Sequence, residues 1–226
     1  MSAIYIHIPF CKTRCTYCDF HSGTNFSLKR KYIEALKEEI VLRKNYLENH
    51  CIKTIYFGGG TPSLLESDDL KSIFDALNQN FDLSFCEEIT LECNPDDLSE
   101  NYVRQLTNLP INRLSIGIQS FNDSELKFIN RRHSAKQAED TVKRCQQNGF
   151  SNISVDLIFG LPFQTLESFE YNIDKAIELN VQHISVYGLT FENGTKIEQQ
   201  RQQKLFNEID EETSILMYQA AIEKLT

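Results

Sequence analysis

Six strand-like runs alternate with helical patterns along the chain, and this alternation constrains the fold more than any other feature of the sequence. Each run is followed by a segment with apolar residues at helical spacing. Repeated β–α units place consecutive strands side by side and parallel, joined by right-handed crossovers. The sequence therefore predicts an α/β fold on a parallel sheet. The six runs are Ile4–Ile8, Ile52–Phe57, Glu88–Glu92, Arg113–Ile118, Ile153–Ile158 and His183–Leu189.

The helical patterns carry start signals of their own. N-cap residues are expected at Ser67, Ser99, Asp123, Ser134 and Thr165, because each precedes or opens a helical pattern with a side-chain oxygen. The chain has no Gly/Ser linker, no low-complexity segment and no change in composition, so residues 1–226 are predicted to form a single domain. The expected helices cover residues 28–47, 68–79, 100–108, 124–130, 135–148, 166–180 and 208–225.

The predicted strands are apolar on one side and polar on the other. A parallel sheet covered by helices on both faces would be apolar on both. Helices must then cover the apolar side only, and the polar side must line a wet or ligand-filled interior. We predict an open partial (β/α)6 barrel; the alternative is a sheet with one face open to solvent. The polar series includes Tyr5, His7, Thr90, Glu92, Ser115, Gly117, Gln119, Ser154, Asp156, Ser185 and Tyr187.

Charge and hydropathy exclude two classes of partner. The chain has 23 Lys and Arg against 32 Asp and Glu, a formal charge of −9. Binding to a phosphate backbone needs concentrated positive charge, so no nucleic-acid partner is expected. No run approaches the roughly 18 consecutive apolar residues of a membrane span, and the N-terminus does not resemble a signal peptide. We therefore expect a cytoplasmic protein with no membrane span.

Three of the seven cysteines crowd into one loop directly after the first strand. Cys11, Cys15 and Cys18 have the spacing C-x3-C-x2-C. Cysteine thiolates hold iron–sulfur clusters, and three ligands for a four-iron cube leave one iron open to another molecule. The alternative is a zinc site made by the same cysteines and His21. The scattered cysteines are expected to be core or partly exposed residues; they are Cys51, Cys86, Cys93 and Cys145.

Four further motifs follow the ends of later strands. Glycines there allow a ligand to approach the backbone, although a tight turn needs them too. Glu92 and Asp156 are candidate acceptors for polar ligand groups, unless Glu92 is merely a solvated charge. Arg131 offers a fork of donors to a carboxylate, and Arg132 is expected to be an exposed charge at a helix end. The motifs are Phe57-Gly58-Gly59-Gly60-Thr61-Pro62, Thr90-Leu91-Glu92-Cys93-Asn94-Pro95, Ile116-Gly117-Ile118-Gln119-Ser120-Phe121 with Asn130-Arg131-Arg132-His133, and Val155-Asp156-Leu157-Ile158-Phe159-Gly160-Leu161-Pro162.

The cysteine loop, its flanks Tyr5–Phe10 and Asp19–Ser22, and the four motifs together resemble the radical S-adenosylmethionine (SAM) superfamily. Within it, the chain is similar to the group that contains the HemW haem chaperones and the oxygen-independent coproporphyrinogen III oxidase. The resemblance runs from Tyr5 to about Thr190. It implies a 4Fe–4S cluster on the three loop cysteines, with one iron open to SAM. It also implies SAM-binding roles for Tyr5, Tyr17, Gly59, Gly60, Thr61, Glu92, Gln119, Arg131 and Asp156.

Phe20 separates the two branches of this group. The oxidase has a further cysteine two residues after the third ligand, whereas the chaperone branch reads Cys-Asp-Phe, as Cys18-Asp19-Phe20 does here. The resemblance therefore favours a chaperone that binds a cluster, SAM and haem or a related porphyrin, and delivers haem to an acceptor protein. Decarboxylation of coproporphyrinogen III is the alternative, and no catalytic residue is assigned with certainty. Family members continue into a C-terminal region that is absent here, which implies that this chain represents the radical SAM core.

No histidine is singled out as a haem ligand by the sequence. His7, His21 and His133 are candidates, and each has an ordinary structural or exposed role as its alternative.

Overall fold

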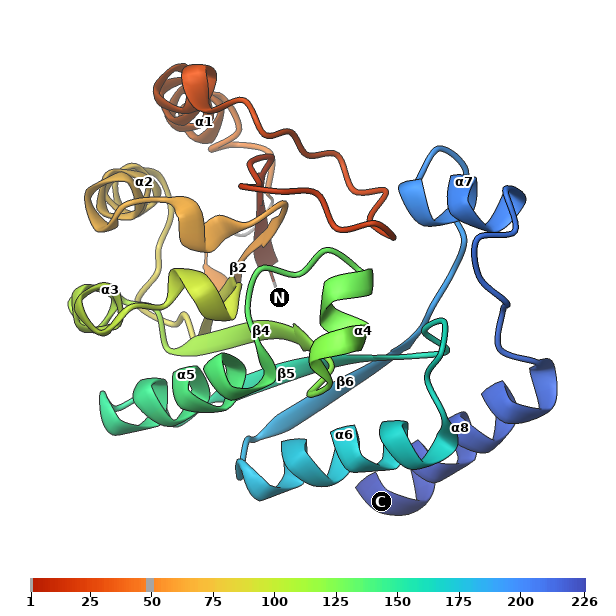
Figure 1. Cartoon of the computed structure of the whole chain (residues 1–226). Helices are drawn as coiled ribbons and strands as arrows, with labels where there is room; N and C mark the ends of the chain where they lie inside the picture. Colours follow the sequence, from red (N-terminus) through yellow and green to blue (C-terminus); the bar gives the residue numbers. More distant parts are fainter. Residues whose placement is uncertain (1, 48–50) are drawn as a thin grey trace.

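Six parallel strands form one sheet in the computed structural model, which describes residues 2–47 and 51–226. The strands lie in the order of the chain, and every neighbouring pair is parallel (Figure 1). Within the described residues, the first and last strands are not paired with each other, so the predicted open parallel α/β sheet is confirmed. The strands are β1 (Ser2–Ile8), β2 (Ile52–Gly59), β3 (Glu88–Cys93), β4 (Arg113–Gln119), β5 (Ile153–Phe159) and β6 (His183–Gly188).

The helices follow the strands as the alternation requires. In Figure 1, α1, α2, α3, α5 and α6 succeed one another around the outside of the curved sheet, and α8 packs beside α6. The α-helices are α1 (Lys29–Leu42), α2 (Ser67–Asn80), α3 (Glu100–Leu106), α4 (Asp123–Phe128), α5 (Ala135–Gln147), α6 (Leu166–Glu178), α7 (Lys196–Gln202) and α8 (Glu211–Leu225). Short 3-10 helices are η1 (Phe26–Leu28), η2 (Pro62–Leu64) and η3 (Pro95–Asp97).

The predicted separation of the two sheet faces is confirmed. The apolar residues of β4 and β5 are buried in one core that also contains Leu70 and Ile73 of α2 and Phe169 of α6. Cys145 lies in the same core, as expected from its place on the α5 stripe. The polar residues of the strands therefore face the concave side of the curved sheet. The fully buried strand residues include Leu114, Ile116, Ile118, Ile153, Val155 and Leu157.

Some predicted helix boundaries are wrong. Helix α1 ends at Leu42 rather than at residue 47, and Leu47 packs against the core from outside the helix. Ser67 is already helical, because Glu66 forms a capping box with Asp69. The three caps expected at Ser99, Ser134 and Thr165 are confirmed.

Two further boundaries depend on local side chains that the periodicity did not reveal. Helix α4 is capped by Asn122 rather than by Asp123, since the Asn122 side chain accepts from the Ser124 N–H. Helix α7 was not predicted; its only two buried residues are Ile197 and Glu198, which gives no apolar stripe to recognise. Among the described residues, no helix has the length and apolar character of a membrane span.

Candidate functional site

A cavity of ≈ 480 Å³ opens between the carboxyl ends of the strands and the cysteine loop. Ligand sites in α/β folds form at this end of the sheet, and this volume is in their usual range. Tyr5 is the one predicted site residue that does not line the cavity; it stacks on Tyr56, with ring centroids 6.0 Å apart. The predicted residues that do line it are Cys11, Cys15, Tyr17, Cys18, Gly59, Gly60, Thr61, Glu92, Gln119, Arg131 and Asp156.

The cysteine loop is held against the rest of the protein by main-chain hydrogen bonds. The Thr16 N–H donates to the carbonyl of Ile129, just after α4, at 3.1 Å. The Thr16 carbonyl accepts from the N–H of Ile197 in α7 at 2.9 Å. The Asn130 side chain adds a bond to the Arg14 carbonyl at 2.8 Å. Helix α7 therefore forms part of the support for this loop, and Figure 1 shows it beside the loop tip.

Two of the three loop sulfurs accept hydrogen bonds from side chains on other elements. The Thr61 hydroxyl donates to the Cys11 sulfur at 3.4 Å. Nη1 of Arg131 donates to the Cys15 sulfur, also at 3.4 Å. Donors of this kind are typical of the surroundings of metal-ligand sulfurs, because they stabilise negative charge on the thiolate.

The third sulfur belongs to Cys18, which is partly exposed. Burial raises the pKa of the Cys18 thiol, and a hydrogen bond from the Phe20 backbone partly offsets that effect. Burial also raises the pKa of Tyr17, with the Cys15 sulfur as a neighbouring contributor. A buried thiol prefers its neutral form, so a bound cation would favour the thiolate of Cys18.

The zinc alternative requires His21 to join the three cysteines. His21 is exposed, and its carbonyl accepts a hydrogen bond from Nε2 of His7 at 2.8 Å. Across residues 2–47 and 51–226, no three His, Cys, Asp or Glu side chains gather as ligands of one metal ion would. Within the described residues, neither the Cys3His21 arrangement nor a closed set of the three cysteines alone is therefore preformed.

The glycines at the end of β2 line the cavity with backbone groups that no side chain covers. Gly59 has a φ of +107°, a conformation that side chains rarely adopt, and its N–H donates to the Glu92 carboxylate at 3.1 Å. A Cβ on Gly60 would lie 2.7 Å from the carbonyl oxygen of Phe10 and 2.8 Å from that of Ile8. Only glycine fits at Gly60, because the obstructing atoms are backbone.

Glu92 is a buried, hydrogen-bonded carboxylate rather than a solvated charge. In addition to the bond from Gly59, it accepts from the Tyr56 hydroxyl at 2.7 Å. Burial raises the pKa of Glu92, although the Tyr56 hydrogen bond acts in the opposite direction. The carboxylate is therefore positioned at the strand end by two fixed donors.

Two polar residues complete the floor of the cavity. Gln119 has a φ of 74°, and the β4–β5 register shifts between Gly117 and Gln119. A bulge of this kind redirects a side chain at the end of a strand. Burial raises the pKa of Asp156, and a hydrogen bond to Ser185 on the next strand opposes that shift.

Arg131 joins the cysteine loop to the strand ends. Besides its bond to Cys15, its Nη2 donates to Oδ1 of Asn94 at 2.6 Å and to the carbonyl of Gly117. Its Nε is buried and has no hydrogen-bond partner in the described part of the chain. Arg131 lines the cavity and has one buried donor without a partner among the described residues, which suits a residue that would meet an anionic ligand group.

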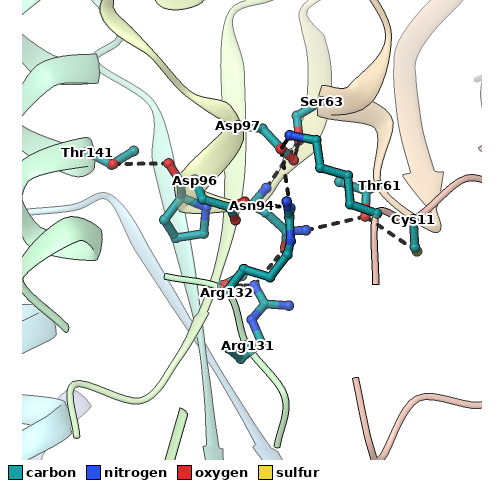
Figure 2. Close-up of polar contacts among 12 residues, drawn as sticks. Cys11, Thr61, Ser63, Asn94, Asp96, Asp97, Arg131, Arg132 and Thr141 are labelled. Carbon is teal, nitrogen blue, oxygen red and sulfur yellow. Dashed lines mark hydrogen bonds and ion pairs between the residues drawn. The ribbon is translucent and has the colours of Figure 1, made fainter. Parts of the chain in front are cut away.

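Arg132 is not the exposed helix-end charge that the sequence suggested. Its Nη2 lies 2.6 Å from the Asp96 carboxylate and 3.3 Å from that of Asp97 (Figure 2). Asp97, whose side chain is 2% exposed, also pairs with Lys12 of the cysteine loop at 2.7 Å and accepts from Ser63 at 2.9 Å. This charged cluster ties the loop to the β3 end, and it was missed because its members are far apart in sequence.

Asn94 was also missed as a site residue. It lines the cavity, and it follows Glu92 by two positions in a motif the sequence analysis quoted. That position at a strand end was the available signal.

Of the histidines, His133 is buried, donates through Nε2 to the Ile118 carbonyl at 3.1 Å, and has its pKa lowered by burial to about 3.

Comparisons with known proteins identify the family of the chain. The sequence profile of the Radical SAM superfamily matches residues 5–176. The chain is 38% identical over 230 residues to the heme chaperone HemW of Bacillus subtilis, covering 100% of this chain and 60% of that protein. It is 36% identical over 218 residues to the heme chaperone HemW of Lactococcus lactis, covering 96% and 57%.

The chain thus spans 57–60% of the length of these curated relatives. Among solved structures, it is similar to coproporphyrinogen III oxidase (HemN) from Escherichia coli, a radical SAM enzyme. The TM-score is 0.87 at 27% identity, and the match covers 99% of this chain and 52% of that one.

Proposed function

The chain belongs to the radical SAM superfamily, whose profile covers residues 5–176, and from that premise we propose that it is a haem chaperone with a resident cluster. Membership of this superfamily implies a 4Fe–4S cluster and SAM. In our proposal Cys11, Cys15 and Cys18 bind the cluster, SAM occupies the adjoining cavity, and haem is the cargo passed to an acceptor protein. The observation that carries the proposal is the single cavity that joins these cysteines to the strand-end polar residues.

The donor set fits a cluster. Three cysteines border one cavity, two of their sulfurs accept side-chain hydrogen bonds, and the backbone of Gly59 and Gly60 borders the same cavity. Three thiolates leave one iron without a protein ligand. When bound, the cluster and SAM together supply one-electron reductive cleavage of the SAM sulfonium bond, and the protein provides orientation and exclusion of water.

The strand-end residues fit the polar groups of SAM. Arg131 has an unused buried Nε donor for the SAM carboxylate. Glu92 and Asp156 are acceptors for the ammonium and the ribose hydroxyls, and Gln119 projects from the bulge between them. Gly59, Gly60, Thr61 and Tyr17 border the same space, and Tyr5 supports it from outside through Tyr56.

The chaperone assignment rests on the relatives named heme chaperone HemW and on Phe20. Phe20 lines the cavity where the oxidase branch would have a further cysteine, and its ring is 60% exposed. A cytoplasmic location belongs to this proposal, because thiolate ligands such as Cys11, Cys15 and Cys18 suit a reducing compartment. The charge of −9 argues against a nucleic-acid partner.

The second candidate function is that of an oxygen-independent coproporphyrinogen III oxidase. The observation that favours it is the TM-score of 0.87 to that enzyme. The two candidates share the cluster and SAM and differ in whether the porphyrin is transformed.

One preparation tests both candidates. The protein is reconstituted anaerobically with iron and sulfide, analysed for both elements, titrated with haem, and assayed with SAM, reductant and coproporphyrinogen III. The chaperone proposal expects a cluster, a haem-dependent Soret band and no protoporphyrinogen IX. Product formation would establish the oxidase instead, and stoichiometric zinc without iron would refute the cluster.

A further inference from the structure

Asn94 lies between Thr61 and Arg131, the two residues whose side chains donate hydrogen bonds to the loop sulfurs. It follows β3 directly, and no ligand role has been assigned to it so far. Its Oδ1 accepts from Nη2 of Arg131 at 2.6 Å, and its Nδ2 donates to Oγ1 of Thr61 at 3.3 Å. Figure 2 shows the amide between these two partners, with Cys11 beyond Thr61.

The direction of each hydrogen bond around Asn94 follows from the chemical groups that form it. Arginine only donates, so the oxygen of the Asn94 amide must face Arg131 and its NH2 must face Thr61. The Thr61 hydroxyl then accepts from Asn94, which leaves its single proton for the Cys11 sulfur at 3.4 Å. Arg131 in turn is held so that Nη1 reaches the Cys15 sulfur at 3.4 Å.

The position of Asn94 is itself well determined. Its backbone N–H donates to the Ser63 hydroxyl at 3.2 Å, and Ser63 donates to the nearly inaccessible Asp97 carboxylate. Asn94 is therefore attached to the end of the sheet through η2 and η3.

We propose that Asn94 is a positioning residue that directs one hydrogen bond onto each of two cluster ligands, onto Cys11 through Thr61 and onto Cys15 through Arg131, and so raises the reduction potential of the cluster. Hydrogen bonds to ligand sulfurs stabilise the more negative, reduced cluster. This inference rests on the proposed function, because it requires a cluster on these cysteines.

Two substitutions test the route through Thr61. In Asn94→Asp the carboxylate cannot donate, so the Thr61 proton turns toward it and Cys11 loses its hydrogen bond. Thr61→Val removes the same bond and leaves Asn94 intact. Both are expected to shift the cluster midpoint potential to more negative values in EPR-monitored redox titrations without SAM. Thr61→Ser keeps the hydroxyl and is expected to retain the wild-type potential.

The added charge of Asn94→Asp lowers the potential by itself, so the double variant is needed. If Asn94 acts through Thr61, the shift caused by Asn94→Asp is smaller in the Thr61→Val background than in the wild type. Equal shifts in both backgrounds would overturn the proposal. Asn122→Asp is the matched control, because Asn122 caps α4 through an oxygen that aspartate also provides, and it does not line the cavity. Its potential should equal that of the wild type.

Iron and sulfide analysis separates this inference from the proposed function. A wild-type protein that takes up no cluster overturns both. A wild-type cluster whose potential is the same in Asn94→Asp and Thr61→Val overturns the role of Asn94 only. If Asn94→Asp takes up no iron, Asn94→Ala replaces it: this change removes the donor without adding charge, and an unchanged potential in Asn94→Ala refutes the inference.

Discussion

The cavity has two walls, and they are built in different ways. The sheet wall consists of strand-end residues such as Glu92, Gln119 and Asp156, whose positions follow from the register of neighbouring strands. The loop wall consists of the cysteine loop, which is held by contacts from η3, α4 and α7. The residues of the sheet wall are therefore positioned by the sheet itself, whereas the cysteines of the loop wall are positioned by a few hydrogen bonds and ion pairs to residues distant in sequence. The two walls should therefore respond separately to substitution.

The largest effect is expected on the loop wall. Replacing Cys11, Cys15 or Cys18 with Ala should abolish the broad absorption near ~400 nm of the anaerobically reconstituted protein, because thiolate-bound iron–sulfur centres produce it. The sheet wall should keep its fold, as far-UV circular dichroism will report. Cys86→Ala, at a partly exposed cysteine outside the cavity, is the control and should stay coloured. Colour retained in all three ligand variants would contradict the assignment.

The next effect concerns the anchor of the loop. Asp97→Asn should lower the free energy of unfolding by about 1.5–3 kcal/mol, because hydrogen bonds from Lys12, Ser63 and Arg132 converge on this inaccessible carboxylate. Urea denaturation of the apoprotein measures this, and faster iron loss from the reconstituted protein should accompany it. Asp140→Asn, which breaks only the exposed pair with Lys136, should cost about 0.5 kcal/mol or less. Equal losses in both variants would mean that Asp97 does not anchor the loop.

A substitution on the sheet wall should spare the loop wall. Asp156→Asn should weaken SAM binding about 10- to 100-fold, the effect of losing one charge-assisted hydrogen bond. Iron and sulfide contents should not change, since Asp156 does not contact the cysteines. Calorimetric titration with SAM is the measurement, with the exposed Asp174→Asn variant as control. Loss of iron in Asp156→Asn would show that the walls are coupled.

The sheet wall should also show a characteristic pH dependence. Burial raises the pKa of Glu92, so the folded protein holds a proton at pH values where the unfolded chain has released it. The free energy of unfolding therefore falls as pH rises from the unfolded pKa through the folded one. Glu92→Gln has no such proton, so its stability relative to the wild type should increase over this range in urea denaturation.

Asp82 provides the control of opposite sign. Hydrogen bonds from Ser84 lower the pKa of Asp82, so its contribution is present above the unfolded pKa and is lost as pH falls. Asp82→Asn should accordingly lose stability relative to the wild type as pH rises. The same slope in both variants would show that burial at Glu92 does not control its ionisation.

The smallest effect is expected at Tyr5, which lies outside both walls. Its ring is 59% exposed, and its hydroxyl lies 3.3 Å from Nδ1 of His7. Tyr5→Phe should change SAM affinity by less than about threefold, within the usual range for exposed positions. A loss of tenfold or more in the same titration would place the hydroxyl against the ligand, contrary to the geometry.

The contrast between the walls also explains how much the sequence could predict. Alternation with a period of two identified the apolar face at Leu114 and Ile116 and the polar face at Ser115, because strand geometry imposes that period. Parallel strands end at the same edge, so the strand-end residues were expected to lie together. The pair of Lys12 and Asp97 could not be inferred, because the two residues are 85 positions apart and no periodic pattern relates them. Arg132 was misjudged for the same reason.

The bonds at Thr16 also determine when the loop can become ordered during synthesis. The cysteine loop leaves the ribosome before its partners Ile129 and Ile197, which follow it by more than a hundred residues. A nascent chain released only as far as α6 lacks the bond from Ile197 of α7 to the Thr16 carbonyl. The cysteine loop therefore gains its contact with α7 long after the loop itself has been made. Thiol alkylation of nascent chains stalled before and after residue 197 would reveal this order.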